Sequence, residues 1–421
     1  MVKIKFLGAA GEVGRSAFLV DAGEKFLMDF GVKLHPKGIE YPLPVETNIK
    51  AAIISHAHLD HSGNLPHLYQ KSSPLAYMTP PTLELSRMLW FDTLKIAGLE
   101  AMDAAFSKEE IARTERFTFP VGYKRRLEIF EDTFLEFFDA GHVAGSAISK
   151  ISFKNGKTLI YTGDVKLNET RLHMGADIPK GNCDWLIIEG TYGDRDHPNR
   201  KETEKRFVES VQDTVDRGGI ALVSTFALGR SAEMLDIVNE YNITGDVYFD
   251  GMCQKAAIIY MNYPKYIKNP VFLKKALARA MWIKNRAMRK KAVKKPGIII
   301  TTSGMLQGGP IYEYLPHVQA DKNSTLYLTG YQVQETPGRI LLETGQIKLN
   351  GISVTPKMKV ERYDFSSHAG REELFKIIKK ISPQKVIGVH GDPEILKKFK
   401  ASLKEEGFDA YAPSLGDEMT L

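Results

Sequence analysis

The chain contains 421 residues, of which 43% are hydrophobic and 26% are charged. This composition is typical of a folded globular protein and excludes a disordered, collagen-like or repeat-dominated chain. A chain of this length is expected to form two or more hydrophobic cores.

Neither a membrane partner nor an oxidising compartment is indicated by the sequence. No apolar run approaches the ~18–20 residues that a membrane-spanning helix needs, and residues 1–8 read as a strand rather than as a signal peptide. The two cysteines, Cys183 and Cys253, cannot form a disulfide framework and lack the spacing of zinc ligands. We therefore expect a cytoplasmic protein.

Basic residues are unevenly distributed along the chain. The 57 Lys and Arg residues exceed the 51 Asp and Glu residues by 6. Twelve of the basic residues and none of the acidic ones lie between Pro264 and Pro296, so that the rest of the chain has a net charge of −6. Such clustering is typical of a surface that binds a polyanion such as nucleic acid, although a solvated basic helix gives the same pattern.

The predicted elements change in character along the chain. The first sixty residues contain short strands, punctuated by Gly, Pro and Asn, at residues 2–7, 17–21, 25–29 and 51–55. The middle third alternates helices that end near residues 217 and 241 with strands at 220–224, 247–249, 298–302 and 325–329. The last part is predicted to contain a strand at 385–389, a helix at 393–406 and a strand at 408–412. The middle third therefore resembles a separate α/β domain.

Several predicted strands are followed by a residue that can bind a metal ion or a proton. These residues are Asp29, His56, His142, Asp164, Glu189 and His390. Loops at strand ends, held in place by a rigid sheet, are where α/β proteins carry their chemistry. A set of structural histidines would be more scattered, so the pattern favours a functional site.

The densest group of such residues is His56-Ala-His58-Leu-Asp60-His61. Three imidazoles and a carboxylate within six residues suit borderline-soft divalent cations, zinc first. His56 and His58 can point at one ion, and Asp60 and His61, on the following turn, can point at a second. Two such ions typically lie ~3.5–4 Å apart and bridge a hydroxide. A lone histidine is more often structural, but this cluster predicts a metal site.

The cluster resembles the His-x-His-x-Asp-His signature of the metallo-β-lactamase superfamily. The other superfamily motifs follow in the same order, as Met-Asp29-Phe-Gly, Gly-His142-Val-Ala-Gly-Ser and Tyr-Thr-Gly-Asp164. The resemblance implies two Zn2+ ions, one held by His56, His58 and His142, the other by Asp60 and His61, with Asp164 bridging both. It also implies that Asp29 orients a ligand imidazole, a role that metal-binding histidines require on physical grounds too.

Three further motifs resemble the β-CASP branch of this superfamily, which consists of nucleases. Glu189-Gly-Thr-Tyr-Gly is similar to the first motif, Ser366-Ser-His368-Ala-Gly to the second and Val389-His390-Gly-Asp to the third. A histidine at the third position is typical of members that act on RNA, and the resemblance implies that His390 completes the second zinc site. The most similar subgroup is that of archaeal cleavage and polyadenylation specificity factor-like and ribonuclease J-like ribonucleases.

Two stretches of the middle third also resemble the β-CASP branch. Phe226-Ala-Leu-Gly-Arg230 looks like its Gly-Arg nucleic-acid motif, and Thr302-Ser303-Gly304-Met305 is similar to a phosphate-cradling turn. Gly338-Arg339 adds a second arginine in a glycine-flanked setting. The resemblance implies that RNA phosphates are bound by Arg230, Ser303, Gly304, Met305 and Arg339.

The fold implied by the resemblance is α/β, a metallo-β-lactamase αββα sandwich with an inserted β-CASP α/β domain. The expected bounds are residues 1–194 and 361–421 for the metallo-β-lactamase domain and residues 195–360 for the β-CASP domain.

The implied function is zinc-dependent hydrolysis of single-stranded RNA, in RNA processing or decay, to give 5′-phosphate and 3′-hydroxyl ends. We expect a metal-bridging hydroxide as the nucleophile, with Asp60 holding its proton. We expect His368 to protonate the leaving oxygen and Glu189 to keep His368 oriented and cationic.

Other functions remain open at this point. One alternative is a small-molecule hydrolase acting on thioesters or lactones, and another is a non-catalytic RNA-processing subunit, which would have lost ligands that this chain retains. The sequence also leaves open whether cleavage is endonucleolytic or 5′→3′ exonucleolytic. The relatives suggest a homodimer.

Overall fold

The computed structural model describes residues 2–35, 38–45 and 48–420. They fold into two compact units. The first unit comprises the described residues of Met1–Glu169, His173–Asp196 and Ser367–Leu421, and the second comprises Thr170–Leu172 and His197–Ser366. Two segments that are distant in sequence therefore build the first unit together.

The first unit contains two seven-stranded sheets. One sheet has the strand order β24 (Glu418–Thr420), β1 (Lys3–Phe6), β2 (Phe18–Asp21), β3 (Lys25–Met28), β6 (Ala51–Ile53), β7 (Leu75–Met78), β8 (Thr118–Pro120). The other has the order β23 (Ala410–Tyr411), β22 (Lys385–Val389), β13 (Trp185–Glu189), β12 (Thr158–Tyr161), β11 (Ala147–Ser152), β10 (Thr133–Asp139), β9 (Leu127–Phe130). A two-stranded ribbon pairs β4 (Lys33–His35) with β5 (Gly38–Glu40).

An apolar layer fills the space between these two sheets. Phe6, Phe18 and Phe26 of the first sheet belong to the same buried cluster as Phe137 and Tyr161 of the second. The rings of Phe18 and Tyr161 meet edge to face with their centroids 5.3 Å apart. Alternation of side chains along each strand directs one apolar set inward and the next outward, so each sheet also has an apolar outer face.

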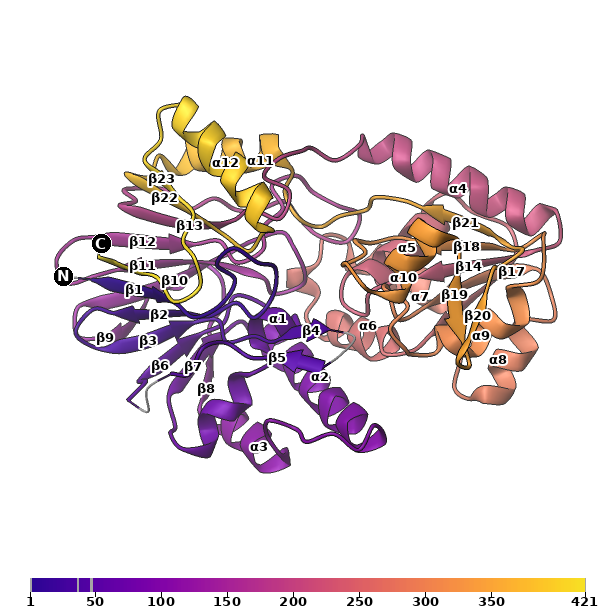
Figure 1. The fold of residues 1–421 in the computed structure, drawn as a ribbon, viewed down its shortest axis with the longest axis horizontal. Coiled ribbons are helices and arrows are strands. Elements are labelled where there is room, and N and C mark those ends of the chain that lie inside the picture. Colours follow the sequence, from indigo (N-terminus) through magenta and orange to yellow (C-terminus); the bar gives the residue numbers. More distant parts are fainter. Residues whose placement is uncertain (1, 36–37, 46–47, 421) are drawn as a thin grey trace. The chain divides into compact units, whose positions relative to one another are not determined.

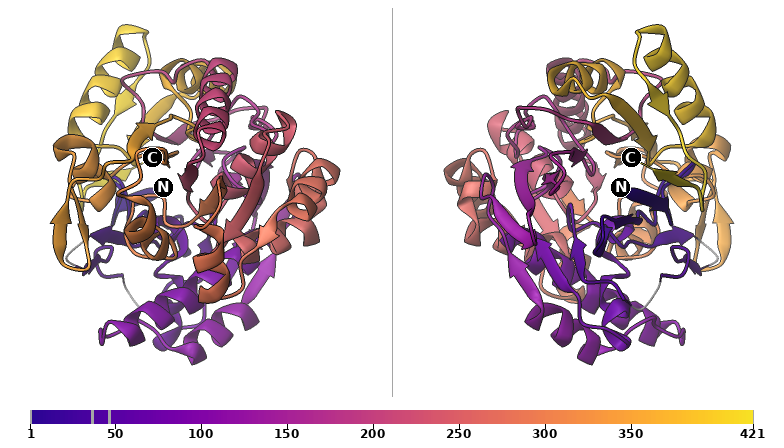
Figure 2. Two further views of the ribbon diagram at one scale, coloured as in Figure 1. Left: turned by 90° about the vertical axis from the view of Figure 1, so that its right-hand side faces the viewer. Right: turned by 90° about the vertical axis from the view of Figure 1, so that its left-hand side faces the viewer.

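Helices cover both outer faces (Figures 1 and 2). The outer face of the first sheet packs against the 3-10 helix η1 (Leu65–Gln70), α2 (Pro80–Leu99) and α3 (Lys108–Arg116). The short helix α1 (Leu59–Ser62) lies beside α2. The outer face of the second sheet packs against α11 (Arg371–Ile381) and α12 (Pro393–Glu405). The αββα sandwich implied by the sequence resemblance is confirmed.

The second unit is built on a six-stranded sheet in which every neighbouring pair is parallel. Its order is β16 (Met281–Trp282), β15 (Asp246–Asp250), β17 (Gly297–Thr301), β14 (Ile220–Ser224), β18 (Thr325–Leu328), β21 (Lys359–Arg362). Its remaining elements are α4 (Arg200–Asp216), α5 (Arg230–Glu240), α6 (Cys253–Asn262), the 3-10 helix η2 (Pro264–Tyr266), α7 (Pro270–Arg279), α8 (Arg286–Ala292), α9 (Ile311–Val318), α10 (Pro337–Thr344) and the hairpin β19 (Ile347–Leu349) with β20 (Ile352–Val354).

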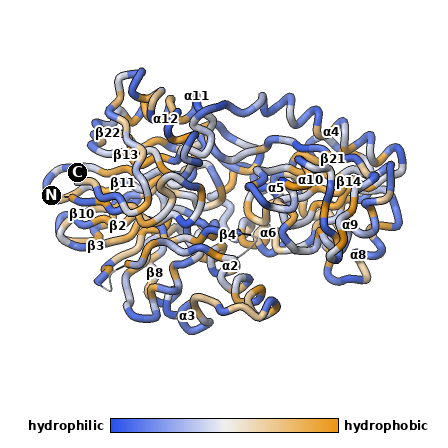
Figure 3. Tube along the Cα trace, in the orientation of Figure 1, coloured by the Kyte–Doolittle hydropathy of each residue, from blue (hydrophilic) through white to orange (hydrophobic). Residues whose placement is uncertain are grey.

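Both faces of this parallel sheet are buried. On one face the Phe207 ring of α4 lies 5.5 Å from the Tyr327 ring of β18. On the other face Leu326 packs in a cluster with Ile311 of α9 and Leu341 of α10. Because both faces are covered, the central strands consist largely of apolar residues and appear mostly in orange in Figure 3. Within the described ranges, no helix has both the length and the apolar character that crossing a membrane requires.

Candidate metal centre

The residues that follow the strands of the first unit meet at one edge of the sandwich. Four strands of the second sheet run in the same direction. The strands β12, β13 and β22 pair in parallel. The strand β10 also runs in their direction, because both β10 and β12 are antiparallel to β11, which lies between them. Their carboxyl ends therefore lie at one sheet edge, as in other α/β proteins. In the other sheet, β3 and β6 are also parallel to each other.

The turn after β6 carries the densest group of ligands. His56 and His61 are fully buried there. The turn is held by its backbone, since Ser16 N donates to Asp60 O over 2.7 Å and Phe30 N donates to His61 O over 2.8 Å. The neighbouring Gly31 lies so close that a Cβ atom at this position would be 1.8 Å from Asp60 O.

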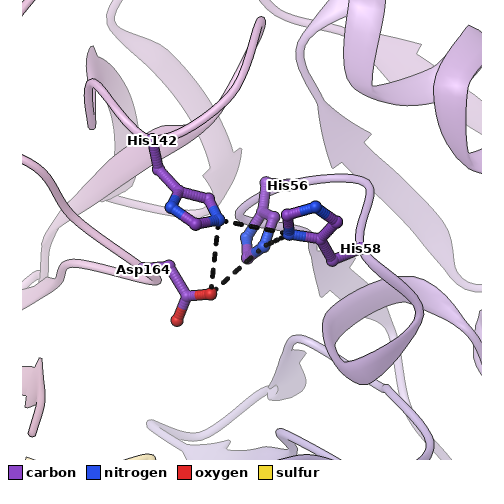
Figure 4. Close-up of side chains that lie close together, drawn as sticks. All are labelled: His56, His58, His142 and Asp164. Carbon is purple, nitrogen blue, oxygen red and sulfur yellow. Dashed lines mark hydrogen bonds and ion pairs between the residues drawn. The ribbon is translucent and has the colours of Figure 1, made fainter. Parts of the chain in front are cut away.

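Four side chains form the first donor set, which is drawn in Figure 4. Nδ1 of His58 lies 3.1 Å from Nε2 of His56 and 3.1 Å from Nε2 of His142. Oδ2 of Asp164 lies 3.4 Å from Nε2 of His56 and 3.5 Å from Nε2 of His142. In a tetrahedral zinc site with bonds of 2.0–2.1 Å, neighbouring donors are about 3.3–3.4 Å apart. The spacing therefore fits a zinc-sized ion.

A second donor set lies on the other side of the same carboxylate and consists of Asp60, His61, Asp164 and His390. Oδ1 of Asp164 lies 3.4 Å from Nε2 of His61 and 3.3 Å from Nδ1 of His390. Oδ2 of Asp60 lies 3.3 Å from Nε2 of His390. Asp164 thus divides its two oxygens between the two sets.

Two buried polar atoms at this place lack a hydrogen bond to any described residue. Nε2 of His61 and Oδ1 of Asp164 are buried, and neither has a hydrogen-bond partner among the described residues. Leaving such a group unsatisfied costs about 1–3 kcal/mol. A cation between the two atoms would satisfy both, so the residues present fit a metal ion.

The ionisation of His56 and His142 is also suited to metal binding. Burial and the neighbouring His61 hold the pKa of His56 well below its usual value, and burial and His368 do the same for His142. Neutral imidazole is the form that binds metals. Burial alone would lower the pKa of His61, but Asp164, Asp60 and Asp29 outweigh it and raise this pKa well above its usual value. The carboxylates around His61 therefore favour a positive charge at the second donor set.

Hydrogen bonds fix which ring nitrogen faces the cluster. Nδ1 of His142 donates to Ser367 O over 2.9 Å, which leaves Nε2 to face the first donor set. Asp29 acts in the same way on His61, whose Nδ1 lies 2.7 Å from Oδ2 of Asp29. Ser55 and Tyr161 donate to that same Asp29 oxygen, each over 2.7 Å. Partners of this kind orient ligand imidazoles and raise their basicity.

His368 and Glu189 lie beside the two donor sets. Nδ1 of His368 is 2.9 Å from Oε2 of Glu189 and 4.0 Å from Oδ2 of Asp164. Burial lowers the pKa of His368, but Glu189 and Asp164 outweigh it and raise this pKa to about 9. His368 is therefore cationic at neutral pH, and its side chain remains 22% exposed.

A buried ion pair that the sequence analysis did not identify holds the loop of His368 in place. Nζ of Lys166 lies 2.6 Å from Oε2 of Glu373. Glu373 also accepts hydrogen bonds from the backbone N–H groups of Asn168 and Gly370. The pair thus joins the loop after Asp164 to the start of α11. The sequence offers one signal, because an acidic residue three positions into a helix is a capping residue.

The predicted RNA-binding residues all lie in the second unit. Ser303, Gly304 and Met305 form a turn after β17, and this turn contacts the start of α10, where Gly338 N donates to Met305 O over 3.0 Å. The two arginines have acidic partners within the unit. Arg230 is buried and lies 2.8 Å from Glu233, and Arg339 pairs with Glu343 over 2.5 Å.

Three family models match the chain. The model "Metallo-beta-lactamase superfamily" matches residues 11–217, "Beta-Casp domain" matches residues 233–341, and "Zn-dependent metallo-hydrolase RNA specificity domain" matches residues 353–413. The sandwich and its donor sets are those of a metallo-hydrolase. The chain belongs to the metallo-β-lactamase superfamily, in the branch that carries a β-CASP domain.

Curated relatives cover the whole chain. It is 40% identical to "Probable RNase MJ4" of Methanocaldococcus jannaschii, with 100% of both chains covered. It is 35% identical to "RNase aCSPSF2" of Saccharolobus solfataricus, with 99% of this chain and 85% of the relative covered. It is 34% identical to "Transcription termination factor FttA" of M. jannaschii, with 93% of this chain and 67% of the relative covered.

Solved structures also resemble this chain. One of them is a protein of unknown function from Enterococcus faecalis V583, which matches over 100% of both chains with a TM-score of 0.62 and 14% identity. At this identity the likeness concerns the fold alone.

The packing of Gly31 leads to a first prediction. Gly31→Ala places a methyl group against the backbone of Asp60 and His61, so the turn must shift. We expect the free energy of unfolding to fall by about 1–3 kcal/mol and the metal affinity to fall with it, as measured by denaturant unfolding and by metal titration.

Gly98→Ala is the matched control. Gly98 lies in the exposed part of α2, where an added Cβ meets no atom within 4 Å. This change should raise stability by about 0.5–1 kcal/mol and leave metal affinity unchanged. Equal behaviour of the two variants would contradict the role given to Gly31.

Proposed function

We propose that this protein is a ribonuclease that hydrolyses phosphodiester bonds of single-stranded RNA with two zinc ions. The observation that carries the proposal is the shared carboxylate of Asp164, which faces a complete donor set on each side. The RNA specificity model that matches residues 353–413 and the relatives named as RNases support RNA as the substrate.

The metal-binding residues would act as two groups. One ion would be held by His56, His58 and His142. The other ion would be held by Asp60, His61 and His390. Asp164 would contribute to both sites. When bound, such a pair of ions lowers the pKa of water towards neutrality and offsets the charge of the phosphate. Asp29 would keep Nε2 of His61 turned towards its ion through the hydrogen bond at Nδ1.

The chain's own residues would move the protons. Asp60, whose side chain is 32% exposed, would accept a hydrogen bond from the attacking nucleophile and so hold its proton. His368 would donate a proton to the leaving 3′-oxygen, because Glu189 holds it as a cation and its ring is open to solvent on one side. The products would be a 5′-phosphate and a 3′-hydroxyl.

The number of metal ions can be counted directly. We expect the wild-type protein to bind about two equivalents of zinc, as the two donor sets require. Removing one ligand of the first set in His58→Ala should leave about one equivalent, whereas Asp164→Ala should weaken both sites. Metal content measured by mass spectrometry after dialysis tests this, with His317→Ala, an exposed histidine of the second unit, as the control. Two equivalents retained in Asp164→Ala would contradict the shared role of this carboxylate.

A substitution of His368 should change the rate of catalysis without changing the binding of metal or RNA. His368→Ala removes the proton donor and should lower kcat for RNA cleavage by roughly 10²–10⁴-fold, with metal content and RNA affinity unchanged. Glu189→Gln should lower kcat in the same direction, because an amide does not stabilise the imidazolium. His67→Ala serves as the control, since this exposed histidine lies outside both donor sets and donates to Ala105 O. Unchanged kcat in His368→Ala would remove it from the mechanism.

One experiment distinguishes the cleavage modes and the substrate class. The same RNA is labelled at either end and prepared with a 5′-monophosphate, a 5′-triphosphate or a 5′-hydroxyl. Single nucleotides released from the monophosphate alone indicate a 5′→3′ exonuclease, and discrete internal fragments from all three indicate an endonuclease. Hydrolysis of thioesters or lactones without any cleavage of RNA would overturn the proposed function.

A further inference from the structure

The loop that carries His368 lies where the chain returns from the second unit to the first. The chain leaves the first unit after Asp196 and re-enters it after Ser366, two residues before His368. Residues 195–199 and 363–370, all of which the structure describes, form neither helix nor strand. The position of His368 therefore depends on contacts other than those of regular secondary structure.

Asp364 joins these two crossings through its carboxylate. Its Oδ1 accepts a hydrogen bond from Ser366 N over 3.0 Å, a turn that Asp side chains often form with the backbone two residues on. Its Oδ2 lies 3.1 Å from Nδ1 of His197. One oxygen thus holds the backbone just before His368, and the other attaches it to the outgoing crossing. The side chains are mostly buried, with 27% of Asp364 and 11% of His197 exposed.

The carboxylate of Asp364 is charged in the folded protein. Burial raises its pKa, but His197 outweighs this effect, with help from Ser366 N and Arg230, and the pKa lies below its usual value. Hydrogen bonds to an ionised group are shorter and roughly twice as strong as neutral ones. The link between the two crossings is therefore directional and short.

The residues next to His197 hold the far side of the same loop. Arg371 N donates to Arg195 O over 3.0 Å, and Glu372 N donates to Oδ1 of Asp196 over 2.8 Å. Residues 195, 196 and 197 each bind one point of the chain between Asp364 and Glu372. His368 lies between the bound points, so its loop is held on both sides by three consecutive residues.

The attachment of this loop to the core does not itself require Asp364. Phe365 is fully buried, and its ring meets that of Phe207 of α4 edge to face at 5.4 Å. The guanidinium of Arg200 lies over the same ring at 4.6 Å. An ion pair that is partly open to solvent adds little stability beyond such contacts. Its place beside His368 is where it acts.

We propose that Asp364 and His197 are positioning residues for the cleavage reaction, which hold His368 where it meets the leaving oxygen of the phosphodiester. The inference rests on the proposed ribonuclease function, in which His368 is the proton donor. A misplacement of about 1 Å can cost about 10²-fold in rate. A contact that contributes little to stability can therefore contribute much to kcat.

The test replaces the leaving oxygen by sulfur. An RNA with a 3′-bridging sulfur at the cleaved linkage releases a thiolate, which departs without a proton because a thiol is far more acidic than an alcohol. We expect Asp364→Ala and His197→Ala to lower kcat for ordinary RNA roughly 10–100-fold. KM, zinc content and kcat for the sulfur-containing RNA should stay at the wild-type values.

Two further variants test whether the pair acts as one contact. His197→Asn keeps an N–H near the place of Nδ1, so it should restore kcat for ordinary RNA relative to His197→Ala. The double variant His197→Ala/Asp364→Ala should lose no more than Asp364→Ala alone, because the second change removes nothing that remains.

A carboxylate with the same local contacts provides the matched control. Asp321, in the loop before β18, accepts hydrogen bonds from Asn323 N over 3.0 Å and from Ser324 Oγ over 2.6 Å. Asp321→Ala should leave kcat for both RNAs unchanged. Amide hydrogen exchange at residues 364–372, measured without metal, should rise in Asp364→Ala and not in Asp321→Ala.

The variant His368→Ala separates this inference from the function on which it rests. It should lose cleavage of ordinary RNA and retain cleavage of the sulfur-containing RNA. If it does so while Asp364→Ala cuts both RNAs as the wild type does, or loses both equally, the positioning role is overturned and the ribonuclease function stands. If His368→Ala loses both RNAs equally, the proton-donor role falls and this inference falls with it.

Discussion

The carboxylate of Asp164 is the group on which the rest of the candidate metal centre depends. It is buried, and one oxygen faces His56 and His142 while the other faces His61 and His390. A buried carboxylate is stable in a protein interior only when a positive charge lies next to it. The sandwich supplies the geometry, because its parallel strands deliver their following residues to one edge. Asp29, Glu189 and the Lys166–Glu373 pair then prevent these side chains from turning away.

The features that could be predicted from the sequence are those that depend on short, continuous stretches of residues. Four ligands lie within six residues, and each remaining ligand follows a strong apolar run, either directly or after a short turn. The strands at 220–224 and 385–389 were predicted with their observed bounds, because buried parallel strands are short, continuous apolar runs. The αββα architecture itself came from the family resemblance, since neither sheet order nor layer order is encoded in local periodicity.

What could not be predicted depends on contacts between distant residues. The long helix α2 begins with two prolines, and its apolar residues do not concentrate on one face. The helical periodicity of apolar residues is therefore weak in its sequence. The strand predicted at 408–412 is limited to Ala410–Tyr411, and the strand β24 that follows it was missed, because its pairing partner is at the other end of the chain. Arg230 was predicted as a phosphate contact, and the burial of its pair with Glu233, three positions further along α5, depends on packing against distant residues. His390 adopts a positive φ of 49°, a conformation that surrounding packing imposes on non-glycine residues.

The position of β22 in the chain has a consequence for biosynthesis. This strand lies between β13 and β23 in the second sheet and delivers His390, the last of the candidate ligands to leave the ribosome. Until then β13 has an open edge, and the second donor set lacks an imidazole. A nascent chain therefore emerges beside its own messenger with an incomplete centre, and the ability to cut RNA arises only after the segment that carries β22 and His390 has been synthesised.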